Sequence, residues 1–500
     1  MLLFFIFPTS ALPAPPAGQF RAAVLEHELI LPSPCLATVC SRARAIQLME
    51  QNLWVMEQQV VEAARLGAEI ILLPEDGIHG YGHASRDILR PFLEFVPPVA
   101  DGSNPCYEEN GEDDGYVQSR LSCLAAENEI YIGASMGSVV AGCEYCQHGG
   151  PCYYNTFVLY NNTGHLVGVY HKYNLWTSEL STYDIDLGPS LVTVETEFGR
   201  LGLAVCADLM WRSPIVELVE QHNISTLLLP LSWWDLFPHQ LAHSNQAAWA
   251  RGLQVNLLAA NTHDAASWSS GSGLYSSSGH AAYYHDISPA SAGKLLLADL
   301  DISPSKTEMD WARYASEHQD SLEESDSTFQ ELVYGDTYTF LALRPDQTSA
   351  KVCHQTFCCL AEFSLEQSSE VFSLGVFRGD HYRDGSVSGH WRMEMCTVIK
   401  CDPNNPAATC RQDQSWDYDF LSSSNTVFTS LAIAANFTSG AGVYPEVLFD
   451  GVTLRPDLVN ITQDGVLSLV PQVDVPLVSM SLFGRVYQED PDLPDHYCPG

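Results

Sequence analysis

The fold of this chain is decided by one stretch, Gly199-Arg200-Leu201-Gly202-Leu203-Ala204-Val205-Cys206-Ala207-Asp208-Leu209-Met210-Trp211-Arg212-Ser213-Pro214. The run Leu201–Val205 is apolar and bounded by glycine, which predicts a buried strand. Ser213 and Pro214 are residue types that begin helices, as a cap and in the first turn. We therefore expect Cys206 at a strand-to-helix turn, where backbone N–H groups and a helix dipole favour a thiolate. The alternative is a half-cystine or an inert core thiol.

Strand and helix patterns alternate through the first 305 residues. The patterns predict strands at 20–25, 68–74, 130–135, 156–161, 166–171, 226–230 and 255–261, and helices at 41–66, 117–127, 215–222 and 238–253. The first helix has Ser41 at its start, and Gly67 follows its end, as helix boundaries require. Strand 68–74 is apolar from Ile70 to Pro74, which is typical of a strand buried on both faces. Such repeated units predict a layered α/β domain over residues 20–305.

The pattern changes after residue 305. Residues 306–335 are polar and acidic, and we interpret them as a connector or a solvated surface helix. Short β-type runs then fill residues 336–490, and a polar tail follows at 491–500. Six cysteines in this half predict a smaller β-rich domain held by about three disulfides, with the connectivity left open (Cys353, Cys358, Cys359, Cys396, Cys401 and Cys410).

The charge balance excludes two classes of partner. The chain has 61 acidic and 23 basic residues, for a net charge of −38. Such a surface repels nucleic acid and anionic lipid, so neither is expected to bind. No apolar run is long enough to span a bilayer, and the C-terminus lacks the apolar tail of a GPI signal.

Several features predict a secreted, extracellular glycoprotein. Residues 1–19 resemble a signal peptide, and 15 cysteines indicate disulfides with at least one thiol left over. Local pairs are possible for Cys35 with Cys40 and for Cys106 with Cys123, and the cluster of Cys143, Cys146 and Cys152 fits disulfides better than zinc. Four N-x-[ST] sequons predict glycosylation, at Asn161, Asn223, Asn436 and Asn460.

Three groups with complementary chemistry follow predicted strands in the first domain. Glu75, Lys172 and Cys206 each stand at such an end, and an α/β layer fold gathers these ends on one rim. A carboxylate can take the proton of the thiol, and a cation can stabilise the oxyanion of a tetrahedral intermediate. Taken singly, Glu75 could lie in a solvated turn and Lys172 could be an ordinary surface charge. Together they predict nucleophilic catalysis by a thiol.

The order of three motifs resembles the nitrilase (carbon–nitrogen hydrolase) superfamily: Leu73-Pro74-Glu75, then His171-Lys172-Tyr173-Asn174-Leu175, then Val205-Cys206-Ala207-Asp208. From about residue 20 to 489 the chain is similar to its vanin/biotinidase group, through Ala23-Val24-Leu25-Glu26-His27, Pro230-Leu231-Ser232-Trp233, Cys358-Cys359 and Leu482-Phe483-Gly484-Arg485-Val486-Tyr487. The resemblance implies an α-β-β-α sandwich followed by a smaller disulfide-rich, mainly β base domain.

The resemblance also implies the site. Glu75 is expected to be the general base, Lys172 the oxyanion stabiliser and Cys206 the nucleophile, with Glu179 in support. Substrate contacts are expected from Trp233, His239 and Asn174. The group usually has Phe where this chain has Ala207, so the pocket wall beside the nucleophile is expected to differ.

The implied reaction is amide hydrolysis through a thioester. Pantetheine is the expected substrate because His239 and Trp249 lie in stretches closer to the vanin form than to biotinidase, and biocytin is the alternative. No cofactor is expected, and the appended second domain favours a monomer. His239 and His243 stand four residues apart, but Gln240 replaces the glutamate of a zinc-protease motif, so we expect a helix-surface pair and no metal.

Two alternative hypotheses about function, from other classes of protein, remain. The first is a secreted binding ectodomain without activity, although the complete set Glu75, Lys172 and Cys206 argues against it. The second is an acyl-transferring enzyme on the same scaffold, which would be expected to carry transmembrane helices.

Overall fold

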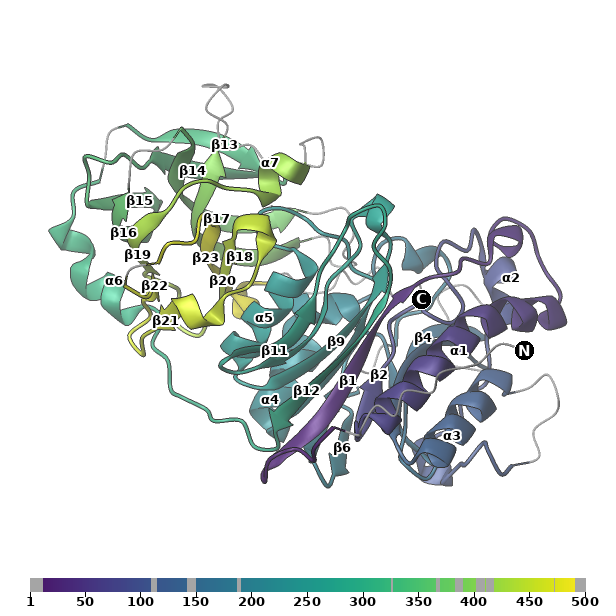
Figure 1. The fold of residues 1–500 in the computed structure, drawn as a ribbon. Helices are drawn as coiled ribbons and strands as arrows, with labels where there is room; N and C mark the ends of the chain where they lie inside the picture. The colour runs from purple at the N-terminus through teal and green to yellow at the C-terminus, as the bar shows by residue number, and fades with distance from the viewer. Residues whose placement is uncertain are drawn as a thin grey trace, which may run out of the picture.

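The computed structural model describes residues 12–108, 115–141, 150–186, 190–324, 327–365, 369–382, 390–401, 410, 418–471 and 473–490. Most of the predicted signal peptide and the polar tail 491–500 lie outside these residues. The chain forms two domains that pack side by side, the first purple to teal and the second green to yellow in Figure 1. Among the described residues, none of the helices combines the length and the apolarity that crossing a membrane requires.

Twelve strands form the sheet of the first domain. The main path runs β5-β4-β3-β2-β1-β9-β8-β7-β6, while β10 and β12 attach to β9 and β1 and β11 pairs with β10. Their bounds are β1 Gln19–Glu28, β2 Ile70–Leu72, β3 Tyr131–Val140, β4 Cys152–Tyr160, β5 Leu166–His171, β6 Thr193–Thr196, β7 Gly199–Leu203, β8 Thr226–Leu231, β9 Asn256–His263, β10 Ser272–Ser276, β11 Gly279–Tyr284 and β12 Lys294–Asp301.

The sheet consists of two halves that face each other. They are joined where β1 and β9 pair over only two residues, His27 with Thr262 and Glu28 with His263. Alternation along β1 explains the layers, because Ala22 and Val24 belong to the core shared with β7, β8 and β9. Their neighbour Ala23 belongs to a separate core beneath the helices. These layers confirm the predicted α-β-β-α sandwich.

Among its described residues, this domain has five α-helices: α1 Arg42–Arg65, α2 Arg86–Leu89, α3 Tyr116–Asn128, α4 Glu217–His222 and α5 Ala242–Leu253. The start of α1 is as predicted, since the Ser41 hydroxyl accepts a hydrogen bond from the Arg44 amide at 3.3 Å. Gly67, just past its end, has a φ of +84°, which only glycine adopts without strain.

Two predicted helix starts were wrong. Ser213 is extended and its hydroxyl makes no hydrogen bond to a described residue, so it does not cap a helix. The helix expected from residue 238 begins at Ala242 instead, because the Ala242 amide donates to the Asp235 carboxylate at 2.9 Å and ends the loop there. That loop, residues 232–241, carries several residues of the site.

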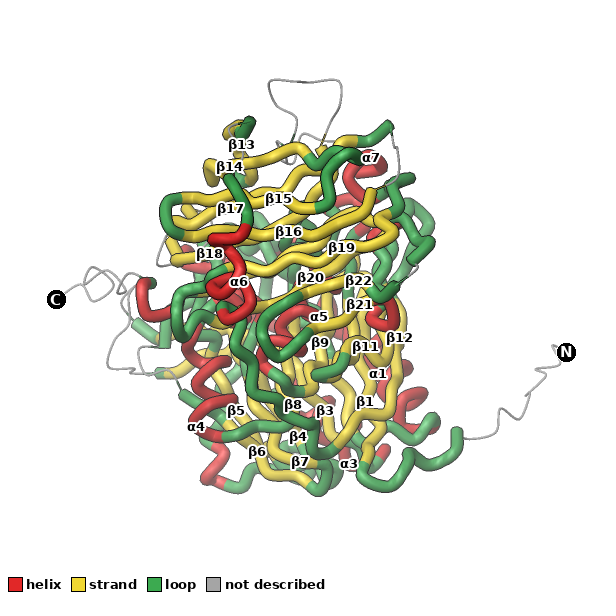
Figure 2. The backbone as a smooth tube through the Cα atoms, turned by 90° about the vertical axis from the view of Figure 1, so that its left-hand side faces the viewer, coloured by secondary structure: helices red, strands yellow, loops and turns green. Residues whose placement is uncertain are grey.

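The second domain is a pair of packed sheets with orders β13-β14-β17-β18-β23-β20 and β15-β16-β19-β22-β21. The strands are β13 Phe329–Val333, β14 Asp336–Ala342, β15 Ser349–His354, β16 Phe357–Leu365, β17 Val371–Tyr382, β18 His390–Cys401, β19 Phe428–Ala435, β20 Gly442–Phe449, β21 Val459–Ile461, β22 Leu467–Leu469 and β23 Leu477–Arg485; the helices are α6 Arg313–His318 and α7 Tyr418–Ser422. Figure 2 shows α6 against one of these sheets. The stretch expected to be a connector thus holds α6 and the edge strand β13.

Three disulfides of the second domain join Cys353 to Cys358, Cys359 to Cys396 and Cys401 to Cys410. The first domain contains the predicted local pairs, Cys35 with Cys40 and Cys106 with Cys123. Cys152 is disulfide-bonded, whereas Cys143 and Cys146 lie outside the described residues. Among the described cysteines, Cys206 alone is free.

The two domains share an apolar and partly charged contact. Trp249 of α5 stacks on Tyr444 of β20 with ring centroids 3.9 Å apart. The buried guanidinium of Arg485 donates from Nε to the Met210 carbonyl at 3.0 Å, at the end of the short helical turn that begins with Cys206. The second domain therefore packs directly against the segment that carries the free cysteine.

Candidate active site

The three predicted catalytic groups meet at one end of the sandwich. Strands β2, β5 and β7 run in the same direction through their pairings, so their carboxyl ends gather on one rim. Lys172 follows β5 directly, and its Nζ lies 2.7 Å from Oε1 of Glu75, just beyond β2. The thiol of Cys206, just beyond β7, interacts with the same Glu75 carboxylate, and both residues line one cavity.

Two further residues complete this polar cluster. Glu179 Oε2 lies 2.6 Å from Lys172 Nζ, so the lysine bridges two carboxylates. Asn155 Nδ2 donates to Glu75 Oε1 and to Glu179 Oε1, both at 2.8 Å. The Asn155 oxygen in turn accepts from the Ser135 hydroxyl at 2.9 Å, which fixes the orientation of the amide. Sequence reasoning missed Asn155, although an amide within the otherwise apolar strand β4 is a signal that it has a polar partner.

Burial controls the protonation of this cluster. Burial, and to a lesser extent the nearby Glu179, raises the pKa of Glu75, against the attraction of Lys172. Burial lowers the pKa of Lys172, but Glu179 and Glu75 outweigh it and hold that pKa well above its usual value. Lys172 is therefore a fixed cation between two carboxylates.

Burial opposes the thiolate that we expected the strand-to-helix turn to favour. Burial, and then the Glu75 carboxylate, raise the pKa of Cys206 well above its usual value, and Lys172 offsets this only in part. Cys206 is therefore a neutral thiol in the resting state. Transfer of its proton to Glu75 moves one negative charge within the buried cluster without adding another, which is the least costly way to form the nucleophile.

The backbone of Cys206 is held in an unusual conformation. Its φ is +47°, a left-handed value that costs a non-glycine residue on the order of 1 kcal/mol. Asp208 fixes the turn, because its carboxylate accepts from the Val205 amide at 2.9 Å and from the Tyr170 hydroxyl at 2.8 Å. Burial raises the pKa of Asp208 to about 6 against these hydrogen bonds.

Asn174, predicted to contact substrate, belongs to this support. Its backbone amide and its Nδ2 donate to Asp208 Oδ1 at 2.9 and 2.8 Å, and Nδ2 also donates to the Ser213 carbonyl at 2.9 Å. The Asn174 side chain is thus committed to the turn that carries Cys206, and it is not among the residues that line the cavity.

The cluster opens into a cavity of about 260 Å³. Its polar residues include the three catalytic groups and Glu179, and its apolar wall contains aromatic side chains from both domains: Trp176, Trp233, Trp234 and Trp391. Trp233 therefore lies where a substrate-contacting residue must lie. Ala207 also lines the cavity, directly beside the nucleophile.

His239 does not line this cavity. It is buried between the domains, where its Nδ1 lies 3.3 Å from the Ser481 hydroxyl and its ring stacks on Tyr338. The expected surface pair of His239 and His243 is also wrong, since both side chains are buried and His239 precedes α5.

The four sequons differ in accessibility. Asn223 and Asn460 are exposed, and Asn161 is half-buried. The half-buried Asn436 uses its Nδ2, the atom that would carry a glycan, to donate to Gln319 Oε1 at 3.1 Å and to the Thr356 carbonyl at 2.9 Å.

Comparison with known proteins identifies both domains. Residues 42–228 match the carbon-nitrogen hydrolase family and residues 327–490 match the Vanin C-terminal domain. The chain is 35% identical to the pantetheinase of Mus musculus over 94% of its length and 90% of that protein, and 34% identical to the pantetheinase of Homo sapiens over 98% and 92%. It is 31% identical to the biotinidase of Takifugu rubripes over 95% of both chains. This chain therefore belongs to the vanin/biotinidase family of carbon–nitrogen hydrolases.

Proposed function

We propose that the protein is a cysteine-dependent amidase that hydrolyses a linear amide through a thioester on Cys206. The observation that carries this proposal is that the buried Cys206 thiol and Glu75 line one cavity, with the Glu75 carboxylate held in place by Lys172 at 2.7 Å. A nucleophile in contact with a base that a third group orients is the arrangement that covalent catalysis requires.

The first half-reaction forms the thioester. Cys206 Sγ attacks the carbonyl carbon of the amide while its proton passes to Glu75. The developing oxyanion is stabilised by the Lys172 ammonium group and by the backbone N–H of Ala207, which lines the cavity. Glu75 then gives its proton to the leaving amine, and the carbon–nitrogen bond breaks.

The second half-reaction releases the acid. Glu75, ionised again, takes a proton from a water molecule that attacks the thioester carbonyl. The carbon–sulfur bond breaks and the proton returns to the Cys206 sulfur, so the enzyme regains its resting state. The same carboxylate acts as base and acid in both halves, which suits a glutamate whose pKa burial has raised toward the working pH.

Pantetheine is the substrate that we propose, giving pantothenate and cysteamine. The support is the higher identity to pantetheinases, 35 and 34%, than to biotinidases, 31 and 29%. The sequence markers His239 and Trp249 add nothing by contact, because both lie in the contact between the domains. Biocytin is the competing substrate.

The test compares cysteamine release from pantetheine with lysine release from biocytin, for the wild type and for Cys206→Ala. We expect pantetheine turnover that falls at least ~10⁴-fold in the variant. Turnover of biocytin alone would keep the chemistry and overturn the substrate. No turnover of either substrate by folded, oxidised protein would favour the non-catalytic binding ectodomain.

We also propose that the protein is secreted and monomeric. The disulfides in both domains fit an oxidising compartment, and the exposed Asn223 and Asn460 are accessible to glycosylation. Expression in cultured cells, with the medium assayed before and after glycosidase treatment and with light scattering on a sizing column, tests both statements.

A further inference from the structure

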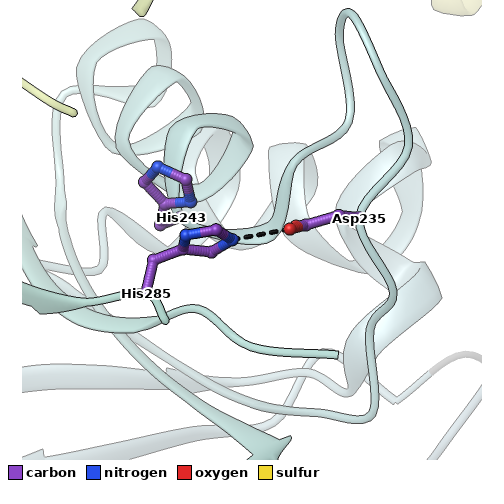
Figure 3. A group of neighbouring side chains, drawn as sticks. All are labelled: Asp235, His243 and His285. Atoms are coloured by element: carbon purple, nitrogen blue, oxygen red, sulfur yellow. Dashed lines mark hydrogen bonds and ion pairs between the residues drawn. The ribbon is translucent and has the colours of Figure 1, made fainter. Parts of the chain in front are cut away.

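A second buried polar cluster lies close to the active-site loop. Asp235 comes from the loop 232–241, His243 from α5, and His285 follows β11 directly (Figure 3). The side chains of Asp235 and His243 are fully or almost fully buried, and the His285 side chain is only 6% exposed. None of the three lines the active-site cavity, so the proposed reaction does not use them.

The three side chains converge on one point. His285 Nε2 lies 2.6 Å from Asp235 Oδ2, and the rings of His243 and His285 are 4.3 Å apart between centroids. Figure 3 shows the two imidazoles one above the other, with Asp235 at the end of the His285 ring. One nitrogen or oxygen atom from each residue lies within 4.8 Å of the others.

His243 leaves one ring nitrogen without a partner. Its Nε2 lies 2.7 Å from the Val452 carbonyl, an acceptor only, so Nε2 carries the proton and donates it. Nδ1 therefore has a lone pair, and it is buried with no hydrogen-bond partner among the described residues. A buried acceptor in that state is destabilising unless a ligand occupies its lone pair.

The hydrogen-bond geometry fits a neutral His243. Its Nε2 proton goes to the Val452 carbonyl, and a second proton on Nδ1 would have no acceptor among the described residues. A neutral imidazole whose other nitrogen donates to a backbone carbonyl is the form in which histidine binds metal ions. The Val452 carbonyl thus already supplies the contact that orients a histidine ligand.

We propose that Asp235, His243 and His285 form a binding site for a divalent transition-metal ion, with Zn²⁺ as the cation that two imidazoles and a carboxylate favour. The ligands would be His243 Nδ1, His285 Nε2 and the Asp235 carboxylate. Binding displaces the proton that His285 Nε2 shares with Asp235, and this proton leaves to solvent. Tetrahedral coordination needs ligand atoms about 3.3 Å apart. The His285–Asp235 pair therefore has to separate from 2.6 Å, while ligand atoms that now lie up to 4.8 Å apart have to approach each other.

The fourth ligand position of the proposed ion would lie beside the second domain. The Tyr418 hydroxyl of α7 lies 3.4 Å from His285 Nε2, near enough to bind a water molecule on the ion or to approach the ion itself. Val452, which orients His243, also belongs to the second domain. A bound ion would therefore join the loop 232–241 and α5 to residues held by the second domain.

The site is a structural one for the active-site loop. Trp234 and Leu236, the neighbours of Asp235, both line the active-site cavity. Fixing the Asp235 carboxylate fixes the loop between them, so the ion would stabilise the cavity wall without touching the substrate. This role is independent of the proposed amidase reaction.

Titration of chelator-treated Cys206→Ala protein with Co²⁺ and then Zn²⁺ tests the proposal. The alanine background excludes binding by the free thiol. We expect one equivalent of Co²⁺, visible absorption bands of tetrahedral cobalt, displacement by Zn²⁺ and a rise in Tm on binding. A spectrum of six-coordinate cobalt, or stoichiometric binding without a rise in Tm, would overturn the proposal.

Variants locate the ion. In the same background, His243→Gln and Asp235→Asn are each expected to weaken binding at least ~100-fold, while the exposed-residue control His165→Gln leaves it unchanged. Asp235→Asn keeps the shape of the side chain, so it separates loss of a ligand from loss of the fold, which near-UV circular dichroism without metal checks. Full-affinity binding by either ligand variant would overturn the assignment.

Discussion

The two buried polar clusters of the first domain differ in how completely they are satisfied. Around Lys172, two carboxylates accept hydrogen bonds from the ammonium group, the Asn155 amide donates to both carboxylates, and the thiol interacts with Glu75. Around His285, the neighbouring His243 keeps a buried nitrogen with no described partner. We interpret the fully partnered cluster around Lys172 as one that transfers protons among its own members. The cluster around His285, in which one nitrogen lacks a partner, leaves a lone pair for a ligand.

After loss of the nucleophile itself, the largest expected effect comes from removing the base. Glu75→Gln keeps the shape of the side chain but cannot accept the thiol proton, so kcat for pantetheine should fall ~10³-fold. Alkylation of Cys206 by iodoacetamide should slow as well, because the thiol loses its base. The matched control is Glu62→Gln on the exposed face of α1, which should leave both rates unchanged. A variant that keeps wild-type alkylation would show that Glu75 is not the base.

The pH profile of the wild type tests the same carboxylate. Activity requires ionised Glu75, and burial raises its pKa, so the rate should fall on the acidic side at a pH above the ordinary glutamate value of 4.5. The measurement is kcat/KM for pantetheine between about pH 4 and 8, a range that covers both an ordinary and a raised glutamate pKa. An acid limb at or below the ordinary value would contradict a buried base.

The next effect concerns the residue that closes the catalytic network. Asn155→Leu has a similar size but removes the donor shared by Glu75 and Glu179, so kcat should fall ~10²-fold, as for the loss of one oriented donor. We expect KM to change little, since Asn155 does not line the cavity. A change in KM alone would mean that Asn155 acts on substrate rather than on the carboxylates.

A smaller effect separates support from substrate contact. Asn174→Ala should lower kcat ~10-fold and destabilise the protein by ~2 kcal/mol, because the buried Asp208 carboxylate and the Ser213 carbonyl both lose the Asn174 Nδ2 donor. Its KM should stay within about twofold of the wild-type value, and so should the KM of His239→Gln, because neither residue lines the cavity. Trp233→Ala is the contrasting variant, since Trp233 lines the cavity and its loss should raise KM.

The smallest effect concerns Glu446, a buried carboxyl group that forms no ion pair with a described residue. Burial raises the pKa of Glu446 to about 8, and its side chain bonds Ser244 across the domain contact. The folded state then keeps a proton that the unfolded state loses above pH 4.5, so stability falls as the pH rises between these values. Glu446→Gln should flatten this decline in Tm, and an unchanged profile would contradict the raised pKa.

Sequence reasoning brought together the three groups of the candidate site but missed some of the residues that support them. Glu75, Lys172 and Cys206 could be predicted because strand ends meet at one rim, a rule that needs no side-chain detail. Asn174 and His239 stand next to functional residues, yet one orients Asp208 and the other lies between the domains. Neighbourhood in sequence does not show which way a side chain points.

The second cluster was beyond sequence reasoning for a different reason. The expected partner of His243 was His239, four residues earlier, and the absence of a glutamate argued against a zinc-protease motif. The residues that do approach His243 come from a loop and from the end of a hairpin strand, with His285 lying 42 positions further along the chain. Only the packing of loop 232–241 against α5 brings them together.

Trp391 makes the complete cavity depend on the folding of the second domain. This side chain lies on β18, a strand that two disulfides attach to its surroundings through Cys396 and Cys401, yet it lines a cavity whose nucleophile is Cys206. The pocket is therefore incomplete until a strand made long after the nucleophile has folded into place. Catalytic competence becomes a late event in biogenesis, tied to oxidative maturation of the other domain, and an immature chain carries a nucleophile without a finished place for substrate.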